Sequence, residues 1–308
     1  MNRTPGTVIR IDSAGYHVDT AEGTFRCSLR GRLKNTPRTT KKPVSVGDRV
    51  HWTPSGPNLG VIDSVEPRRN KLSRRSAGRG DLEHILVANL DQLLIVSSPQ
   101  DPPFRSGLID RMLVAADKNH LDAAICLNKA DLIDHKEWRS RLAYYEDLQY
   151  PLLFTSAVDK TGMDALARFL RKKTTVLSGH SGTGKSSLLS ALQPGLSLRT
   201  GEISSRSGKG RHTTTSVSLL KLDLGGYVVD TPGIRSFGLW DIEPEDLSSH
   251  FPEINELRTG CRFRRCTHTH EPDCPVLAAV ESGHIHADRY ENYTRMLESL
   301  QNPDFDFN

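Results

Sequence analysis

Apolar and polar positions alternate in short runs over the first 70 residues, and glycine turns separate these runs. Residues 7–11 and 16–19 alternate in this way, and residues 24–27 resume after a Glu-Gly turn. Residues 46–52 and 60–65 supply two further runs. Short alternating runs joined by glycine turns indicate a small barrel or sandwich. Five of them fit an OB-type barrel, although an SH3-like barrel would give much the same pattern.

From about residue 85 the pattern changes to continuous apolar runs that alternate with helical stretches. Apolar positions recur at helical spacing around residues 108–116, and a second helix is predicted over roughly 162–172. The predicted strands are residues 85–88, 93–96, 123–127, 152–154 and 174–177. Alternating strands and helices predict an α/β domain with a largely parallel sheet.

The chain beyond about residue 240 forms a third region with helical patterns. It is acidic, with 14 Asp and Glu against 6 Lys and Arg over residues 241–308. We therefore predict three domains, namely an all-β barrel over 1–70, an α/β domain over 71–240 and a mostly α domain over 241–308. Residues 66–84 are polar and basic and are expected to form a linker, and residues 301–308 a disordered tail.

Charge is distributed unevenly along the 308 residues. The net charge is +4, but residues 1–80 hold 16 Lys and Arg against 6 Asp and Glu, a net of +10. A whole basic domain favours a polyanionic partner, and nucleic acid is the expected one. The sequence contains no apolar run of about 18 residues and no secretory signal, so we expect a cytoplasmic protein without a membrane span.

A stretch beginning at Gly179 reads Gly-His-Ser-Gly-Thr-Gly-Lys-Ser and matches the phosphate-loop pattern G-x-x-x-x-G-K-[ST]. It follows a predicted strand and precedes an apolar helix, which is the context that the motif needs. Backbone N–H groups of such a loop wrap phosphate oxygens, and the helix N-terminus adds positive potential. Lys185 is expected to reach the β- and γ-phosphates, and the Ser186 hydroxyl to bind Mg²⁺. The residues assigned to the phosphates are Gly179, His180, Ser181, Gly182, Thr183, Gly184, Lys185, Ser186 and Ser187.

Two further segments are expected on the phosphate side of the site. Asp230-Thr231-Pro232-Gly233 ends a predicted strand, which suits Asp230 to holding Mg²⁺ and the Gly233 N–H to the γ-phosphate. A Gly- and Thr-rich loop lies between this segment and the phosphate loop. One of its threonines is expected to bind Mg²⁺ and close over the γ-phosphate. Thr214 and Thr215 are both candidates, and the sequence does not choose between them.

A guanine-recognition motif, Asn128-Lys129-Ala130-Asp131, follows a predicted buried strand. The Asp131 carboxylate would accept hydrogen bonds from guanine N1–H and the exocyclic amine, whereas adenine offers no matching donors. Asn128 would bind the base edge, and the Lys129 stem would pack against the ring. Thr155-Ser156-Ala157 follows the next strand, and a backbone N–H at Ser156 or Ala157 would face guanine O6. GTP and GDP are therefore the expected ligands.

Three of the five cysteines cluster with histidines near the C-terminal end. Cys261, Cys266, His268 and Cys274 offer three thiolates and an imidazole, which is a complete tetrahedral zinc set. No ligand position is left open, so one structural Zn²⁺ per chain is expected. His270 is the competing imidazole. The two remaining cysteines lie on predicted strands and are expected to be inert core residues.

The order of the motifs is unusual, because the guanine-recognition motif precedes the phosphate loop. Ordinary small GTPases have the phosphate loop first. Circular permutation preserves a closed site when the original termini lie close in space. This order, the basic barrel before it and the Cys/His cluster after it resemble the ribosome small-subunit-dependent GTPase A family (RsgA, also called YjeQ). The resemblance covers essentially the whole chain.

The resemblance implies an OB fold, a circularly permuted GTPase domain and a C-terminal zinc domain. It also implies binding to the small ribosomal subunit and its 16S-type rRNA in late maturation, with GTP hydrolysis stimulated by the subunit. We expect a GTP form that binds the subunit and a GDP form that leaves it. The sequence gives no clear oligomer interface, and a monomer is expected.

The position after the DxxG motif, where many GTPases have the residue that orients the attacking water, has no polar side chain in this sequence. Many GTPases have a Gln after the DxxG motif, but this chain has Ile234. His212, in the loop with the threonines, is the best catalytic candidate and matches a family position proposed for this role. An equally weighted reading is that His212 contacts rRNA or solvent. Two other functions stay open, an RNA-binding adaptor with negligible GTP turnover and a translation factor that delivers a ligand to the ribosome.

Overall fold

The computed structural model describes residues 4–35, 42–75, 83–196, 198, 217–230 and 242–302, and every structural statement below concerns these residues. The chain separates into two compact units, which are described one at a time. The first consists of Met1–Gln92, Ala167–Val176 and Leu192–Ile234. The second consists of Leu93–Leu166, Leu177–Ala191 and Arg235–Asn308.

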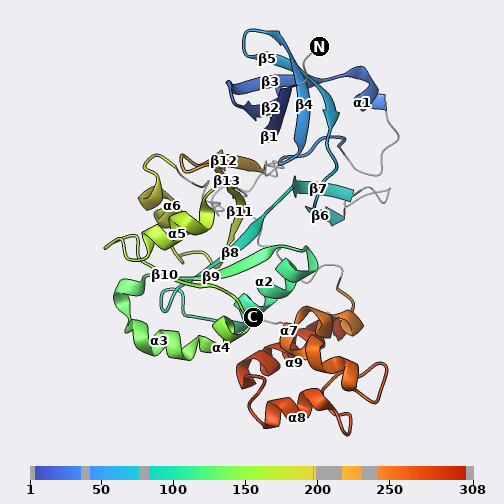
Figure 1. The fold of residues 1–308 in the computed structure, drawn as a ribbon, viewed down its shortest axis with the longest axis vertical. Coiled ribbons are helices and arrows are strands. Elements are labelled where there is room, and N and C mark those ends of the chain that lie inside the picture. Colours follow the sequence, from blue (N-terminus) through green and yellow to red (C-terminus); the bar gives the residue numbers. More distant parts are fainter. Residues whose placement is uncertain are drawn as a thin grey trace, which may run out of the picture. The chain divides into compact units, whose positions relative to one another are not determined.

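A closed five-stranded barrel opens the first unit (Figure 1). Its strands pair in the cyclic order β1-β2-β3-β5-β4-β1, with β3 and β5 parallel and the other pairs antiparallel. This is the arrangement of an OB-type barrel, so the predicted barrel is confirmed and the SH3-like alternative is excluded. The elements are β1 (Thr4–Asp12), β2 (Gly15–Thr20), β3 (Gly23–Leu29), α1 (Gly31–Asn35), β4 (Arg49–Gly56) and β5 (Leu59–Val65).

The barrel interior is filled by alternate residues of its strands, as the period of two requires. Trp52 is fully buried, and its ring lies 4.4 Å from that of Phe25, centroid to centroid. The other members of this core are Val8, Val18, Cys27, Val44, Val50 and Ile62. The basic side chains of the strands therefore remain on the outside of the barrel.

The predicted linker over residues 66–84 contains regular structure, so that prediction is wrong in part. Strand β6 (Lys71–Arg75) pairs antiparallel with β7 (Glu83–Ala88) in a separate two-stranded sheet. Leu72 is buried in this hairpin, and it is the single large apolar side chain of β6. One apolar residue among four polar ones is too weak a pattern to predict a strand, and the strand forms through its pairing with the more apolar β7.

Three strands of the α/β region complete the first unit. Strand β11 (Lys173–Ser178) is parallel to β13 (Gly226–Asp230), and β12 (Ser218–Lys221) pairs antiparallel with β13. The other neighbour of β12 is β1 of the barrel, through Arg10 and Ser218. The barrel and the α/β strands of this unit therefore share one sheet.

The second unit contains the strand order β10-β9-β8, with β9 and β10 parallel. The strands are β8 (Gln92–Ser97), β9 (Asp122–Asn128) and β10 (Leu152–Thr155). The helices are α2 (Ser106–Lys118), η1 (Ala130–Leu132), α3 (His135–Arg141), α4 (Ala143–Asp147), α5 (Met163–Leu170), whose last residues belong to the first unit, and α6 (Lys185–Leu192). The predicted α/β class is confirmed, and its strands end at the loops that carry the nucleotide motifs.

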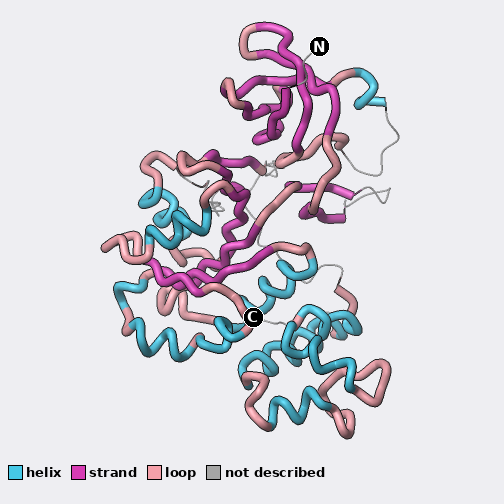
Figure 2. The backbone as a smooth tube through the Cα atoms, viewed as in Figure 1, coloured by secondary structure: helices cyan, strands magenta, loops and turns pink. Residues whose placement is uncertain are grey.

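The C-terminal part of the second unit is helical, as predicted (Figure 2). Its elements are η2 (Pro244–His250), α7 (Pro252–Leu257), η3 (Arg258–Gly260), α8 (Pro275–Glu281) and α9 (Ala287–Gln301). We call residues 242–302 the C-terminal module. Its apolar core includes Phe251, Ile254, Met296 and also Val114 of α2. In the part of the chain that the structure describes, no helix combines the length and the apolarity that crossing a bilayer requires.

Candidate nucleotide site and metal centre

The phosphate loop and the guanine-recognition motif meet in the second unit. The Asn128 side-chain amide donates to the Thr183 carbonyl at 2.8 Å, although 55 residues separate them along the chain. The Thr155 hydroxyl donates to the Asn128 amide oxygen at 3.3 Å. Asn128 and Thr155 are buried, so these hydrogen bonds have little competition from water. The carboxyl ends of β9 and β10 are thereby joined to the phosphate loop.

Two glycines of the phosphate loop stand where a side chain would collide with its surroundings. Gly184 has φ +88°, and a Cβ atom there would lie 2.2 Å from the Asn128 amide nitrogen. Gly179 has φ +146°, and its Cβ would lie 2.0 Å from the Val96 carbonyl oxygen. Both positions therefore require glycine for backbone conformation and for space. The backbone of the phosphate loop is therefore in close contact with Asn128 and Val96.

Helix α6 begins at Lys185, directly after the loop. The Lys185 ammonium donates to the carbonyls of Gly179 at 2.9 Å and His180 at 2.7 Å, so the side chain folds back over the loop. Burial lowers its pKa, because a partly desolvated ammonium is less stable. Ser186, in the first turn of α6, is partly exposed. The helix N-terminus, the ammonium and the hydroxyl thus lie on one short segment suited to an anion.

The remaining guanine-motif residues lie at the ends of β9 and β10. Asp131 is exposed in the turn η1, and Lys129 precedes that turn with φ +63°. Ser156 is fully buried, and its hydroxyl accepts hydrogen bonds from the backbone N–H groups of Val158 at 3.2 Å and Asp159 at 3.4 Å. Ala157 follows on the same turn and is partly exposed. The turn is thus fixed by Ser156 itself.

The sequence predicts a contact between Asn128 and the base edge, and it predicts no role for Thr155. The structure gives Asn128 a positioning contact with the phosphate loop, and Thr155 supports it. It also adds the loop of residues 98–105, because the Lys129 ammonium donates to the carbonyls of Gln100 and Asp101. The chain offers no local pattern for these contacts, since each joins segments that are distant in sequence.

Two of the residues expected to bind magnesium are described, namely Ser186 in α6 and Asp230. Asp230 ends β13 in the first unit and is 2% exposed. The other predicted residues of this side, His212, Thr214, Thr215 and Gly233, lie outside the described residues.

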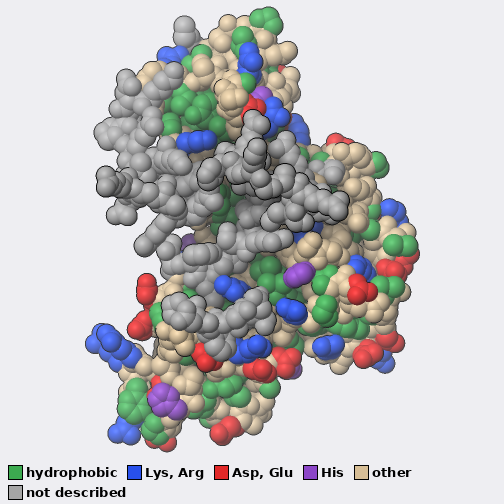
Figure 3. Space-filling view, turned by 180° about the vertical axis from the view of Figure 1, so that it is seen from behind, with side chains coloured by type: hydrophobic (Ala, Val, Ile, Leu, Met, Phe, Trp, Pro, Cys, Tyr) green, Lys and Arg blue, Asp and Glu red, His purple; other side chains and the backbone are tan. Residues whose placement is uncertain are grey.

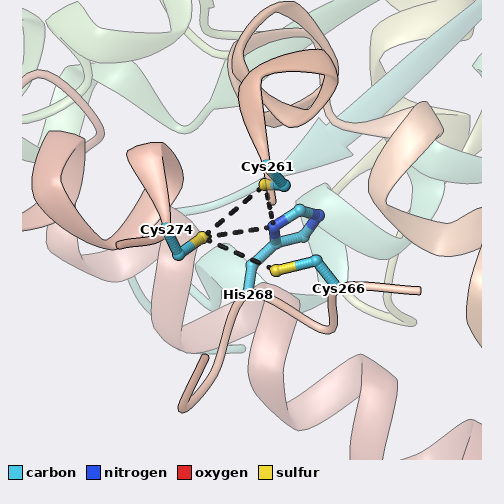
Figure 4. Close-up of side chains that lie close together, drawn as sticks. All are labelled: Cys261, Cys266, His268 and Cys274. Carbon is cyan, nitrogen blue, oxygen red and sulfur yellow. Dashed lines mark hydrogen bonds between the residues drawn. The ribbon is translucent and has the colours of Figure 1, made fainter. Parts of the chain in front are cut away.

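A second group of side chains gathers in the C-terminal module (Figure 4). Cys274 Sγ lies 3.8 Å from the Sγ atoms of Cys261 and Cys266, and 3.5 Å from His268 Nδ1. Cys261 Sγ lies 3.4 Å from the same ring nitrogen. One ligand atom from each of the four residues falls within 4.8 Å of the others, so the cluster can hold a metal ion. His270 is not a member of this group and instead contacts the Thr269 hydroxyl at 2.9 Å.

The loop from Cys266 to Cys274 is held by hydrogen bonds within the loop and by hydrogen bonds from helix α9. The Glu271 carboxylate accepts hydrogen bonds from the Thr267 hydroxyl at 2.7 Å and from the backbone N–H groups of Thr269 and His270. From α9, the Tyr290 hydroxyl donates to the His268 carbonyl at 2.8 Å and the Tyr293 hydroxyl to the Thr267 carbonyl at 2.9 Å. The backbone of the loop that carries His268 is therefore fixed by Glu271 within the loop and by two tyrosines of α9.

The other two cysteines are buried as predicted. Burial raises the pKa of Cys27 to about 11 and that of Cys126 to about 12, since an apolar environment disfavours the thiolate. Both are 2% exposed or less. A thiol that stays protonated is a poor nucleophile and a poor metal ligand, which is consistent with their prediction as inert core residues.

A phosphate loop packed against a guanine-recognition motif, on parallel strands, defines a P-loop protein of the GTPase class. Because the guanine motif precedes the phosphate loop, this GTPase is circularly permuted. The "RsgA GTPase" family model matches residues 65–240, and the "RsgA N-terminal domain" model matches residues 5–62. The chain belongs to the RsgA family and is a GTPase.

Relatives align over nearly their full lengths. A protein of Chlorobaculum parvum named small ribosomal subunit biogenesis GTPase RsgA is 41% identical, with 97% of this chain and 99% of that protein covered. An RsgA of Bacteroides thetaiotaomicron is 39% identical, with 96% and 97% covered. The crystal structure of YjeQ from Thermotoga maritima has a TM-score of 0.80 at 38% identity, with 98% of this chain and 99% of that one covered. YloQ, described as a circularly permuted GTPase, has a TM-score of 0.77 at 30% identity, covering 99% and 98%.

The contact between Gly184 and Asn128 generates a prediction. We expect Gly184→Ala to weaken binding of a fluorescent GTP analogue about tenfold or more, because the methyl group displaces Asn128 or distorts the phosphate loop. Gly195→Ala is the matched control. Gly195 has nearly the same φ of +87° but nothing within 4 Å of an added Cβ. Equal affinities for the two variants would show that the close packing does not matter for binding.

Proposed function

We propose that this protein hydrolyses GTP during biogenesis of the small ribosomal subunit, in the cytoplasm, and that its hydrolysis is stimulated by that subunit. The observation that carries the proposal is the hydrogen bond between Asn128 and the phosphate loop, which supports a single site for guanine and the phosphates. The role in subunit biogenesis is supported by the names of the relatives that align over nearly the full chain.

We assign the nucleotide contacts as the motifs suggest. Asp131, with Asn128 and Lys129, would recognise guanine together with the turn at Ser156 and Ala157. The phosphate-loop residues listed above would hold the phosphates, and Gly233 the γ-phosphate. Ser186, Asp230 and either Thr214 or Thr215 would hold Mg²⁺, whose charge would offset that of the phosphates.

Guanine recognition can be tested by changing the chemistry of one side chain. In Asp131→Asn the carboxylate that accepts guanine N1–H and the exocyclic amine becomes an amide. We expect GTP affinity to fall by about a hundredfold or more, and affinity for xanthosine triphosphate to rise, since xanthine has a carbonyl where guanine has the amine. Titration of both nucleotides measures this. Unchanged GTP affinity would remove Asp131 from the site.

The barrel is the proposed rRNA-binding surface. Two of its buried carboxylates are ion-paired within the first unit: Arg30 Nη2 lies 2.6 Å from Asp63, and Arg68 is bidentate to Asp48 at 2.7 and 2.8 Å. Exposed basic residues of the barrel include Arg26, Arg30, Arg32 and Arg49. Blue side chains are spread over the described part of the barrel in Figure 3. An OB-type barrel with this charge suits a phosphate backbone.

Subunit-stimulated hydrolysis requires a group that orients the attacking water. Ile234 has no polar atom with which to do so, and we propose His212 for this role. We expect small subunits to raise the turnover of the unaltered protein. His212→Ala should lose most of that stimulation, about a hundredfold, while nucleotide and subunit binding persist. Full stimulation in the variant would make His212 an RNA contact or a solvent-exposed residue. Negligible turnover of the unaltered protein with subunits would favour the RNA-binding adaptor.

We propose that the metal of the C-terminal module is one structural Zn²⁺. Tetrahedral zinc with Zn–S of about 2.3 Å and Zn–N of about 2.0–2.1 Å sets neighbouring sulfurs about 3.8 Å apart, and sulfur and nitrogen about 3.6 Å apart. The distances of 3.8, 3.5 and 3.4 Å in the cluster agree with these values. Three thiolates also favour zinc over magnesium or calcium, which prefer oxygen ligands.

Metal analysis checks this assignment. We expect about one zinc per purified chain. Cys266→Ser should lose most of the metal, because a hydroxyl is a poor zinc ligand. Cys27→Ser is the control, since Cys27 is a buried cysteine of the barrel, and it should retain one zinc. Purified protein without zinc, or with zinc unaffected by Cys266→Ser, would contradict the assignment.

A further inference from the structure

One side of helix α2 is bound to the C-terminal module along its whole length. Ser106, Asp110, Val114 and Asp117 recur every three or four residues and so share one helix face. Val114 belongs to the apolar core of the module. Asp117 at the far end accepts from His250 Nδ1 at 2.8 Å. The module is therefore joined to α2 by apolar packing and by polar contacts at both ends of the helix.

A buried cluster of charged side chains lies at the centre of the contact between α2 and the C-terminal module. Arg289 of α9 is 1% exposed, and its guanidinium donates to Asp110 of α2 at 2.6 Å and to Glu253 of α7 at 2.7 and 3.1 Å. The guanidinium lies over the Phe251 ring at 4.6 Å. Tyr145 donates its hydroxyl to the same Asp110 oxygen as Arg289, at 2.8 Å. Buried charges tolerate little displacement, because separating them leaves a carboxylate without compensation.

Asn292, one turn further along α9, reaches the first turn of α2. Its side-chain amide donates to Asp110 Oδ2 at 2.6 Å and to the Ser106 hydroxyl at 3.1 Å. Ser106 is the first residue of α2. The module thus fixes the point at which the loop of residues 98–105 enters the helix.

This loop contacts both halves of the nucleotide site. The Lys129 ammonium donates to the carbonyls of Gln100 and Asp101. On the phosphate side, the Cβ position of Gly182 lies 3.3 Å from Pro102 Cδ and 3.7 Å from the Asp101 carbonyl oxygen. The Ser98 hydroxyl donates to the Pro102 carbonyl at 2.9 Å and closes the loop on itself. A short, internally bonded segment therefore lies between the entry to α2 and the nucleotide motifs.

We propose that Arg289 and Asn292 of the C-terminal module are positioning residues for the nucleotide site. By holding the first turn of α2, they keep the loop of residues 98–105 against Lys129 and Gly182. A partner that displaces the module changes nucleotide affinity through this route. Because coupling between two sites is reciprocal, bound nucleotide also strengthens the attachment of the module. The inference rests on guanine-nucleotide binding at the proposed site.

Asn292→Ala is the test variant, and Glu291→Gln is its control, because Glu291 is the neighbouring exposed residue of α9. We expect Asn292→Ala to weaken binding of a fluorescent GDP analogue about three- to tenfold, and Glu291→Gln to leave it unchanged. Metal content and the unfolding temperature, measured on the same samples, show that the variant is folded. Hydrogen exchange should become faster over residues 98–105 in Asn292→Ala and not in the control.

A double-mutant cycle identifies the route. Ser106→Ala removes the same hydrogen bond from the side of α2, so its effect and that of Asn292→Ala should not add. Wild-type affinity and exchange in folded Asn292→Ala, additive effects in the cycle, or equal weakening by Glu291→Gln would each overturn the inference. Failure of the unaltered protein to bind guanine nucleotide is a different result, since it would overturn the nucleotide site itself.

Discussion

The candidate nucleotide site is organised around one hydrogen bond, from the Asn128 amide to the Thr183 carbonyl. It joins the end of β9 to the phosphate loop, two segments that a circular permutation has placed in the reverse of the usual order. The space for it exists because Gly184 has no side chain. Permutation thus changes the connections between strands but keeps the contacts at their carboxyl ends, where α/β proteins bind ligands.

The same unit carries the metal cluster and the buried Arg289, and these have different physical roles. The Cys/His cluster lies in a loop of the C-terminal module, and Tyr290 and Tyr293 of α9 donate hydrogen bonds to the backbone of that loop. Arg289 and its carboxylates fix the module to α2. A module with its own apolar core that is attached to α2 by buried charges can transmit a displacement as a rigid body, whereas a flexible one would absorb it.

Much of the site was predictable because its chemistry lies in short local motifs. Gly179 to Ser187, Asn128 to Asp131 and the Cys/His spacing each need only a few neighbouring residues to be recognised. Strands were predictable where apolar residues alternated or ran continuously, as in the barrel and in β8. Strand β6 was not, since its burial comes from its partner β7, and its own residues are mostly polar. Asp110 and Asn292 are polar residues in helices and would be expected on the surface, yet both are buried.

The sequence by itself determined the guanine-nucleotide class, the permuted order, the α/β and barrel architectures and the three thiols of the Cys/His cluster. In each case the information lies in residue type and local spacing. Only the tertiary structure decided that the barrel is OB-type, that His268 rather than His270 faces the thiols, and that Asn128 supports the phosphate loop. It also decided that α2 connects the C-terminal module to the loop of residues 98–105. Those features depend on contacts between residues far apart in the chain, and such contacts leave no local pattern to read.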